Sequence, residues 1–259
     1  MKKRVLTVSL LLLCITYTVF GNEPNRPKVI LQTTFGDIGL ELYADEAPIT
    51  VANFLMYVNT GFYDGLVFHR IIPDFMIQSG SHYYANGRAQ SRTAGDRIIN
   101  ESDNGLSNLR GTIAMARYSN PDSATSSFFI NVVDNTFLDR EEAADGYGYC
   151  VFGYVISGMD VVDEIAQTPT ESISYSFPDF PFPEIVYLEM AHEAPPGYWI
   201  GGDLNNNGIV DFGDFAIFAS GFISESNDLS SDLNGDLKID AEDIALLVQN
   251  WLEKTDWYE

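Results

Sequence analysis

The chain has 259 residues, of which 37 are Asp or Glu and 14 are Lys or Arg, giving a formal net charge of -23. Apolar residues make up 46% of the sequence, enough to build a hydrophobic core, which argues against a wholly disordered chain. The acidity argues against nucleic acid or an anionic membrane as the main partner, because phosphate groups would be repelled. Two cysteines exclude a disulfide-stapled scaffold and a four-cysteine zinc site.

Residues 1–21 have the pattern of a secretory signal peptide. Three cations at positions 2–4 precede an uncharged stretch from Val5 to Phe20, and residues 19–21 fit a signal peptidase site. This stretch is short for a membrane span, which needs about 20 residues. We therefore expect a secreted, periplasmic or cell-surface protein with no membrane attachment after cleavage. A single membrane anchor, or a lipoprotein built on Cys14, is the weaker alternative.

Cleavage of this segment would remove three cations and Cys14. The mature chain would then carry a net charge of about -26 and keep Cys150 as its one thiol. Because one thiol cannot form an internal disulfide, we expect the hydrophobic core and bound metal to stabilise the exported protein.

The composition changes near residue 193 and predicts two domains. Residues 193–200 contain Pro195-Pro196-Gly197, a cluster typical of a linker. Mixed polarity and short strand-like runs predict the larger domain over residues 27–192. Loops rich in Asp and Asn predict a smaller domain over residues 201–256.

The larger domain begins with a predicted hairpin and a predicted helix. Residues 29–33 and 38–42 flank Phe35-Gly36-Asp37, and the second run alternates in polarity as a strand does. Pro48 begins a helix and Gly61 ends it, because the apolar residues between them recur with helical spacing. These apolar residues are Val51, Phe54, Leu55 and Val58.

Further apolar runs predict strands at 66–68, 75–78, 111–116, 128–133, 149–155 and 185–190. A second amphipathic helix is predicted over Met159–Ala166. Many short strands with only two helices indicate a mainly β fold, a closed or nearly closed antiparallel barrel with the helices as caps.

The usual catalytic constellations are missing from the sequence. It has no Gly-x-Ser-x-Gly motif and no glycine-rich phosphate loop, and its three histidines lie at no metal-ligand spacing. The larger domain has no paired-carboxylate site that would hydrolyse a polysaccharide. A hydrolase or a nucleotide-dependent enzyme is therefore disfavoured. Residues 68–78 instead place Arg70 and Gln78 among large apolar side chains, which indicates either a binding site or a surface cation beside the core.

Five motifs, in order along residues 28–192, resemble the cyclophilin-type peptidyl-prolyl isomerases, and in particular their bacterial branch. They are Phe68-His69-Arg70-Ile71-Ile72-Pro73 with Phe75-Met76-Ile77-Gln78, Gly111-Thr112-Ile113-Ala114-Met115-Ala116-Arg117, Ser123-Ala124-Thr125-Ser126-Ser127-Phe128-Phe129-Ile130, Phe137-Leu138, and Gly148-Tyr149-Cys150-Val151-Phe152-Gly153. The resemblance implies an eight-stranded antiparallel barrel capped by two helices. It also implies an isomerase that acts on proline-containing polypeptides and needs no cofactor for catalysis.

The chemistry of Arg70 fits that activity. An X-Pro bond crosses between cis and trans over a barrier of about 20 kcal/mol, which comes from amide resonance. A guanidinium that donates hydrogen bonds to the carbonyl and to the nitrogen lone pair of the twisting amide would lower this barrier. An acceleration of about a thousandfold requires only about 4 kcal/mol of preference for the transition state. No nucleophile or general base is needed.

The resemblance assigns roles to twelve residues. The catalytic residues would be Arg70, Phe75 and Gln78, with Gln78 orienting Arg70 and the substrate backbone. The substrate-binding residues would be His69, Met76, Ala116, Arg117, Ser127, Phe129, Phe137, Leu138 and Tyr149. The proline ring would enter a pocket of Phe75, Met76, Phe129 and Leu138, and Arg117 would contribute its main chain. His69 is also explained as a packed neighbour at the rim.

Two positions depart from the family pattern. Ser127 stands where a Gln usually contacts the substrate backbone, and its shorter side chain predicts reduced activity. Phe137 stands where eukaryotic members often carry Trp, which predicts weaker binding of the cyclic inhibitor cyclosporin. Ser127 leaves open an alternative function, a peptide-binding adaptor with weak or no isomerase turnover.

Two loops in the smaller domain, at 203–214 and 232–243, have the spacing of calcium-binding loops. Oxygen-bearing side chains occupy positions 1, 3, 5, 9 and 12, and the carbonyl at position 7 adds a ligand. The predicted ligands of two Ca²⁺ ions are Asp203, Asn205, Asn207, Ile209, Asp211 and Asp214 in the first loop and Asp232, Asn234, Asp236, Lys238, Asp240 and Asp243 in the second. Each loop leads into a predicted helix, over 215–222 and 244–251. Repetition in register makes a pair of chance polar turns the weaker interpretation.

This arrangement resembles a type I dockerin, which implies a small all-α domain that docks onto a cohesin-like scaffold protein when calcium is bound. Leu237 replaces the glycine expected at position 6, and Phe212-Gly213 and Ala241-Glu242 lack the hydroxyl pair often seen there. Calcium binding is therefore the firmer expectation. The sequence predicts a peptidyl-prolyl isomerase that assists the folding of exported proteins and is tethered through a calcium-dependent module.

Overall fold

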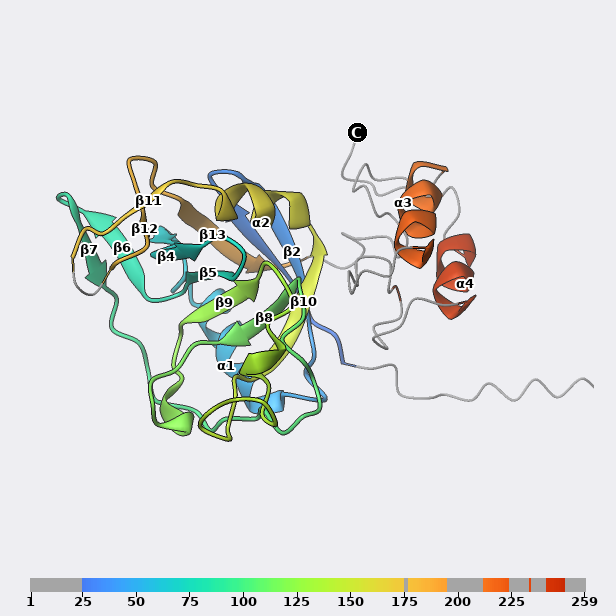
Figure 1. The fold of residues 1–259 in the computed structure, drawn as a ribbon, viewed down its shortest axis with the longest axis horizontal. Helices are drawn as coiled ribbons and strands as arrows, with labels where there is room; N and C mark the ends of the chain where they lie inside the picture. The colour runs from blue at the N-terminus through green and yellow to red at the C-terminus, as the bar shows by residue number, and fades with distance from the viewer. Residues whose placement is uncertain (1–24, 175–176, 195–211, 224–232, 234–240, 250–259) are drawn as a thin grey trace, which may run out of the picture.

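The computed structural model describes residues 25–174, 177–194, 212–223, 233 and 241–249 (Figure 1). The predicted signal peptide, most of the predicted linker and ten of the twelve predicted calcium ligands lie outside these residues. Within the described ranges, no helix is both long enough and apolar enough to cross a membrane.

An antiparallel sheet of nine strand segments dominates the part of the chain up to residue 193 (Figure 1). Its segments are β1 (Lys28–Thr33), β2 (Gly36–Leu42), β3 (Leu66–Val67), β4 (Arg70–Ile72), β5 (Met76–Ser79), β8 (Thr112–Met115), β9 (Phe128–Asn131), β10 (Val151–Ser157) and β13 (Tyr187–Glu193). Their order across the sheet is β3-β13-β1-β2-β10-β8-β9-β5-β4.

The sheet curls until its two edge segments are successive parts of the chain. Only Phe68 and His69 separate β3 from β4. The Phe68 N–H donates to the Val186 carbonyl at 2.9 Å, and the His69 N–H donates to the Gln78 carbonyl at 3.0 Å. The mainly β, antiparallel fold predicted from the sequence is confirmed, in the form of a curled sheet. β3 lies within the run predicted at 66–68, whereas β4 was not predicted as a strand, so the sheet has nine segments where eight strands were expected.

The predicted hairpin and both predicted helices of this part are present. β1 pairs with β2 from Lys28 opposite Glu41 to Thr33 opposite Gly36. Gly36 has φ 132°, a conformation that suits glycine because a side chain would be strained there. The helices are α1 (Pro48–Asn59), which begins at the predicted Pro48, and α2 (Met159–Ala166), whose bounds match the prediction.

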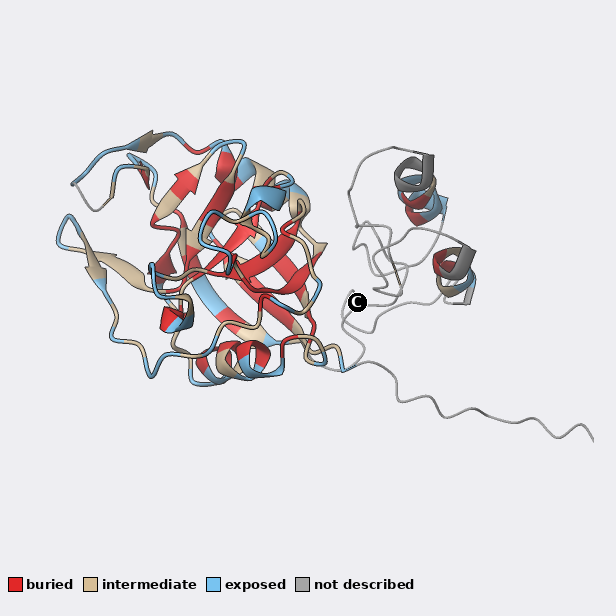
Figure 2. Cartoon of the chain, turned by 60° about the horizontal axis from the view of Figure 1, so that its bottom comes forward, coloured by how far each residue is buried: buried red, intermediate tan, exposed pale blue. Residues whose placement is uncertain are grey.

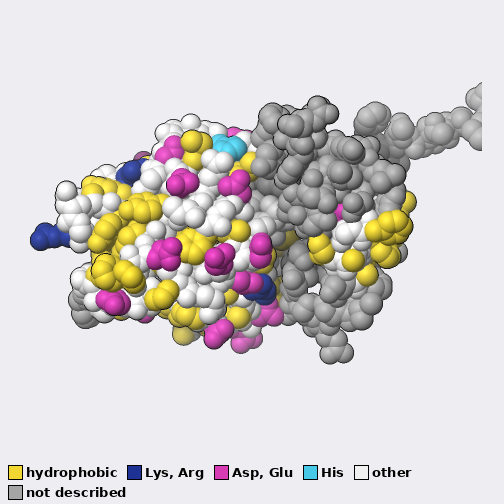
Figure 3. Space-filling model, turned by 90° about the horizontal axis from the view of Figure 1, so that it is seen from above, with side chains coloured by type: hydrophobic (Ala, Val, Ile, Leu, Met, Phe, Trp, Pro, Cys, Tyr) yellow, Lys and Arg dark blue, Asp and Glu magenta, His cyan; other side chains and the backbone are white. Residues whose placement is uncertain are grey.

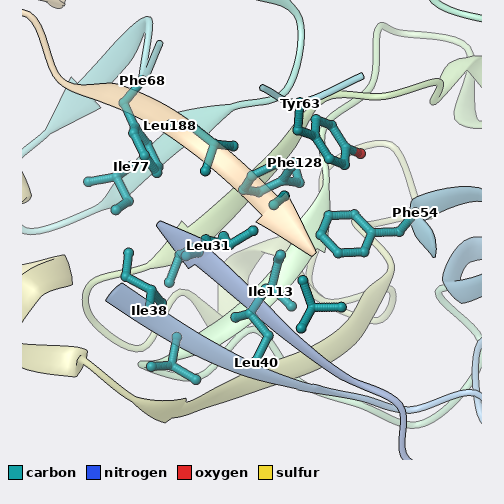
Figure 4. Packing of buried hydrophobic residues seen from close by; sticks show 14 of the residues in the cluster. Leu31, Ile38, Leu40, Phe54, Tyr63, Phe68, Ile77, Ile113, Phe128 and Leu188 are labelled. Atoms are coloured by element: carbon teal, nitrogen blue, oxygen red, sulfur yellow. The ribbon is translucent and has the colours of Figure 1, made fainter. Parts of the chain in front are cut away.

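The hydrophobic core fills the inside of the curled sheet and extends to the inner face of α1 (Figure 2). Figure 4 shows Leu31, Ile38 and Leu40 from the first hairpin packing with Phe54 of α1 and Phe128 of β9. All five side chains have no exposed surface. Burying apolar side chains of this size contributes about 1.5–3 kcal/mol each, so this cluster stabilises the scaffold that carries the site.

Four short strands outside this sheet were also not predicted. They are β6 (His82–Ala85), β7 (Arg88–Ser91), β11 (Thr170–Glu171) and β12 (Phe180–Pro181). β6 and β7 form a hairpin closed by Asn86-Gly87, both with positive φ, and Asn-Gly is a strong local signal for such a turn. β11 pairs with β12. Short 3₁₀ helices lie at Pro121–Ser123 and Thr136–Leu138.

Two helices are described in the C-terminal part, α3 (Phe212–Ile223) and α4 (Ala241–Gln249) (Figure 1). Each begins three residues before its predicted start. The last predicted ligands of the two predicted calcium loops, Asp214 and Asp243, therefore lie in the first turns of these helices. Both side chains are fully buried.

Candidate active site

A row of side chains crosses five strands on the outer face of the curled sheet. Arg70 of β4 lies opposite Gln78 of β5, Gln78 opposite Phe129 of β9, Phe129 opposite Ala114 of β8, and Ala114 opposite Val151 of β10. Adjacent residues of these strands fill the core instead, among them Ile71, Ile77, Ile130 and Ile113. Because successive side chains of a strand point to opposite faces, the strands that build the core also place Arg70 and Gln78 outside it.

An apolar patch on this outer face forms the floor of a cavity of about 640 Å³. Met76, Ala114, Phe129 and Val151 form a cluster separate from the main core. The cavity is lined by His69, Arg70, Phe75, Met76, Gln78, His82, Ser91, Ala116, Arg117, Tyr118, Phe129, Leu138, Tyr149, Phe177 and Pro178. Ten of the twelve predicted site residues are in this set.

The other two predicted residues, Ser127 and Phe137, lie next to the cavity. Ser127 lines a second cavity of about 300 Å³, which shares His69, Gln78 and other residues with the first. Phe137 is 56% exposed and its ring stacks on that of Phe75, with centroids 5.8 Å apart. Ser127 therefore borders a neighbouring space, and Phe137 supports one wall from outside.

The Arg70 guanidinium lies at the edge of the cavity and contacts an acidic side chain. Its Nε is 3.5 Å from Oδ2 of Asp179, and 42% of the Arg70 side chain is exposed. Gln78 is the cross-strand neighbour of Arg70. In the described part of the chain, no hydrogen bond joins the Gln78 side chain to the guanidinium, so Asp179 is the polar contact that we find for Arg70.

The opposite wall depends on the side chain of Arg117 as well as on its main chain. Its guanidinium carbon lies 4.5 Å from the ring centroid of Tyr149. Its Nε and Nη2 donate to the Gly148 carbonyl at 2.9 and 2.8 Å, and Nη2 pairs with Asp145. Tyr149 in turn packs edge-on against Phe129, with centroids 5.7 Å apart. Arg117 thus holds a ring that lines the cavity.

His69 is packed into the rim. Its side chain is buried, and its ring centroid lies 4.5 Å from that of His82 and 6.3 Å from that of Phe177. Burial, with a smaller contribution from His82, lowers the pKa of His69 to about 3. The imidazole is therefore neutral in the folded protein at neutral pH, which agrees with a packed neighbour of the site.

Sequence reasoning missed five residues that line the cavity, namely His82, Ser91, Tyr118, Phe177 and Pro178. His82 and Ser91 belong to the β6–β7 hairpin, which the Asn-Gly turn could have revealed. Phe177 and Pro178 precede β12 and show no comparable local signal. Their position follows from tertiary contacts, such as the ring of Phe177 against that of His82 at 4.9 Å.

The chemistry of the cavity is that of binding and hydrogen bonding. Its floor is apolar and closed, with Met76 and Phe129 only 2% and 4% exposed. The described lining residues include no Asp, Glu, Lys or Cys, and they offer guanidinium, amide and imidazole groups around the apolar floor. Cys150 lies elsewhere, and burial raises the pKa of its thiol to about 12. This arrangement suits a small apolar ring held beside hydrogen-bond donors.

Comparison with known proteins identifies the family. A family model described as cyclophilin type peptidyl-prolyl cis-trans isomerase/CLD matches residues 28–186, more than half of the chain. The chain belongs to the cyclophilin-type peptidyl-prolyl cis-trans isomerases. A second model, dockerin type I domain, matches residues 201–252. The cyclophilin domain is thus followed by a dockerin type I match, as the sequence predicted.

Bacterial cyclophilins are similar over most of their length. Peptidyl-prolyl cis-trans isomerase A of Dickeya dadantii is 47% identical over 174 residues, covering 67% of this chain and 89% of the relative. Peptidyl-prolyl cis-trans isomerase B of Escherichia coli is 51% identical over 143 residues, covering 55% and 85%. A crystal structure of a cyclophilin from Cryptosporidium parvum matches with a TM-score of 0.56 at 23% identity, covering 66% of this chain and 99% of that one, which shows the same fold.

Proposed function

We propose that the 640 Å³ cavity of the cyclophilin domain is its isomerase site and that it binds proline-containing polypeptides. The observation that carries this proposal is the row from Arg70 through Gln78 to Phe129, which places a cation beside a closed apolar floor. The proline ring would rest on Met76 and Phe129, between Phe75 and Leu138. The peptidyl-prolyl isomerase activity itself is supported by relatives of that name, which are identical to this chain at about half of the aligned positions.

Arg70 acts as the catalytic residue in this proposal. Twisting the X-Pro amide concentrates a lone pair on the prolyl nitrogen, and the Nη groups of Arg70 donate to it or to the carbonyl. The bound peptide covers the exposed part of the guanidinium, which strengthens these hydrogen bonds because water is excluded. An acceleration of about a thousandfold corresponds to about 4 kcal/mol, within reach of a charged donor in a desolvated site. Gln78 and His69 border the substrate main chain.

A prolyl-peptide exchange assay tests the catalytic role of Arg70. We expect Arg70→Ala to reduce the catalysed exchange rate to the uncatalysed level. The matched control is Arg97→Ala, which removes an exposed arginine that does not line the cavity and retains the wild-type rate. Equal rates for Arg70→Ala and the wild-type protein would overturn the assignment.

A peptide-binding adaptor with little turnover is the second candidate function. It is favoured by Ser127, whose side chain borders the second cavity and is too short to replace the Gln that is usual in the family. The exchange assay separates the two functions when a proline peptide is titrated in parallel. Saturable binding with exchange at the uncatalysed rate would favour the adaptor.

We further propose that the dockerin match binds two Ca²⁺ ions through the twelve predicted ligands. Asp214 and Asp243 support this, because both carboxylates are fully buried and occupy equivalent positions of the repeat. The Leu233 N–H donates to Oδ1 of Asp243 at 2.7 Å, joining the start of the second loop to α4. Buried carboxylates are unfavourable unless charge and hydrogen bonds compensate them. A bound calcium ion would supply the positive charge.

The predicted signal peptide at 1–21 and the dockerin match support an exported isomerase that acts on folding polypeptides outside the cytoplasm. The domains would span 27–192 and 201–256, with a linker at 193–200. The second domain would tether the enzyme to a cohesin-like scaffold protein. The acidic surface in Figure 3, where Lys and Arg are sparse among Asp and Glu, argues against a polyanionic partner.

A further inference from the structure

The segment that carries Asp179 is firmly anchored beside β4. The Ile71 N–H donates to the Asp179 carbonyl at 3.0 Å, so Asp179 runs along the free edge of the strand that contains Arg70. The next residue, Phe180, is fully buried and belongs to β12, which pairs with β11. On the other side, Phe177 packs against His82 at 4.9 Å between ring centroids. The position of the Asp179 main chain is therefore set by contacts on both sides.

The carboxylate of Asp179 faces the inner end of the Arg70 guanidinium. Oδ2 of Asp179 is 3.5 Å from Nε of Arg70, and Asp179 does not line the cavity. A guanidinium has five N–H groups, and a contact at Nε leaves the four of Nη1 and Nη2 for another partner. This contact thus restrains Arg70 without occupying the groups that would reach a substrate.

An arginine with 42% of its side chain exposed samples several rotamers unless something holds it. Ordering a free arginine side chain on substrate binding costs conformational entropy. We propose that Asp179 is a positioning residue for the isomerase reaction, which holds the Arg70 guanidinium at the cavity before the peptide arrives. This inference rests on the proposed catalytic role of Arg70.

The expected effect is modest, because the ion pair is partly exposed to solvent. Exposed pairs of this kind contribute about 0.2–1 kcal/mol, which corresponds to a change of about fivefold at most. The loss should fall on kcat, since misplaced rotamers of Arg70 still allow the apolar floor to bind the proline ring. If the Asp179 carboxylate only weakened the positive charge that Arg70 presents to the substrate, removing it would raise kcat.

The test compares Asp179→Asn with Glu184→Gln in the full chain. Both variants remove one negative charge from the segment before β13, but Glu184 is exposed and forms none of the ion pairs found in the described residues, whereas Asp179 contacts Arg70. The exchange assay gives kcat and KM for each, and ¹H–¹⁵N NMR of the arginine Nε–Hε groups reports the Arg70 contact directly. We expect Asp179→Asn to lower kcat about threefold to fivefold with KM nearly unchanged and to shift the Arg70 Nε–Hε signal. Glu184→Gln should change neither.

An unchanged or increased kcat in Asp179→Asn, or an unmoved Arg70 Nε–Hε signal, would overturn the inference. The result is distinguishable from failure of the proposed function, because that function fails when the wild-type protein exchanges at the uncatalysed rate or when Arg70→Ala keeps the wild-type rate. A fold defect is recognised separately, since it would move methyl signals of the core residues Ile71 and Ile77 in the same sample.

Discussion

The guanidinium of Arg117 lies over the ring of Tyr149, with its central carbon 4.5 Å from the ring centroid. Only 4% of the Arg117 side chain is exposed, and the carbonyl of Gly148 and the carboxylate of Asp145 hold its nitrogens. The stacked pair connects the end of β8 to the loop that carries Leu138, because the Tyr149 N–H donates to the Leu138 carbonyl at 2.9 Å. The Arg117 guanidinium therefore supports the parts of the cavity wall formed by Tyr149 and by Leu138.

Replacing Arg117 with Lys should weaken substrate binding. Lysine keeps the charge but cannot stack a planar group on Tyr149 while donating twice to Gly148. A cation–π contact contributes about 0.5–2 kcal/mol, so we expect KM to rise about fivefold with kcat nearly unchanged. The control is Arg140→Lys, because Arg140 lies 5.9 Å over Tyr147, a ring that does not line the cavity. Equal KM values for Arg117→Lys and Arg140→Lys would contradict this role.

The cyclophilin domain should lose stability in mild acid because of His69. Its pKa is about 3 in the folded protein, chiefly through burial, against an ordinary value near 6.5. The unfolded chain therefore takes up a proton that the folded chain does not. The neutral, buried His69 therefore costs the folded protein no stability above about pH 6.5. As the pH falls from there toward 3, the free energy of unfolding decreases by at most about 1.4 kcal/mol per pH unit because of this residue.

His69→Phe provides the comparison, since it keeps a ring and removes the titrating group. We expect the wild-type free energy of unfolding to fall more steeply than that of the variant below about pH 6.5, with parallel curves above about pH 7.5. Urea titrations followed through the Ile71 and Ile77 methyl signals would report this domain alone. Parallel curves over the whole acid range would show that His69 does not contribute.

Removing calcium should loosen the C-terminal part without affecting the isomerase. All three tryptophans, Trp199, Trp251 and Trp257, lie in this part of the sequence, so their fluorescence reports on it selectively. Without the metal, the carboxylates of each predicted loop repel one another. We expect a chelator to change the fluorescence, excess Ca²⁺ to restore it, and the exchange rate to stay constant. Asp243→Asn, which alters one buried carboxylate, should need more Ca²⁺ for the same recovery. Tryptophan fluorescence that does not change when the chelator is added would argue against calcium binding.

Much of the scaffold could be predicted because its signals are local. The alternation in polarity at 38–42 predicted the second strand of the first hairpin, and Pro48 marked the start of α1. The repeat of the predicted calcium loops is likewise visible as spacing. The starts of α3 and α4 were predicted three residues late, because the last loop positions already have helical conformation. The β6–β7 hairpin was missed although its Asn-Gly turn is a local signal.

The sequence by itself determined the family and the mainly β class through motifs and strand periodicity, and the family resemblance pointed to ten of the residues that line the cavity. Only the tertiary structure decided that Asp179 meets Arg70, that Phe177 reaches the rim, and that the Arg117 side chain braces Tyr149. These contacts join segments far apart in the chain. The curl of the sheet and the buried anchor at Phe180 create them, and no local pattern of residues encodes which distant side chain a strand edge will face.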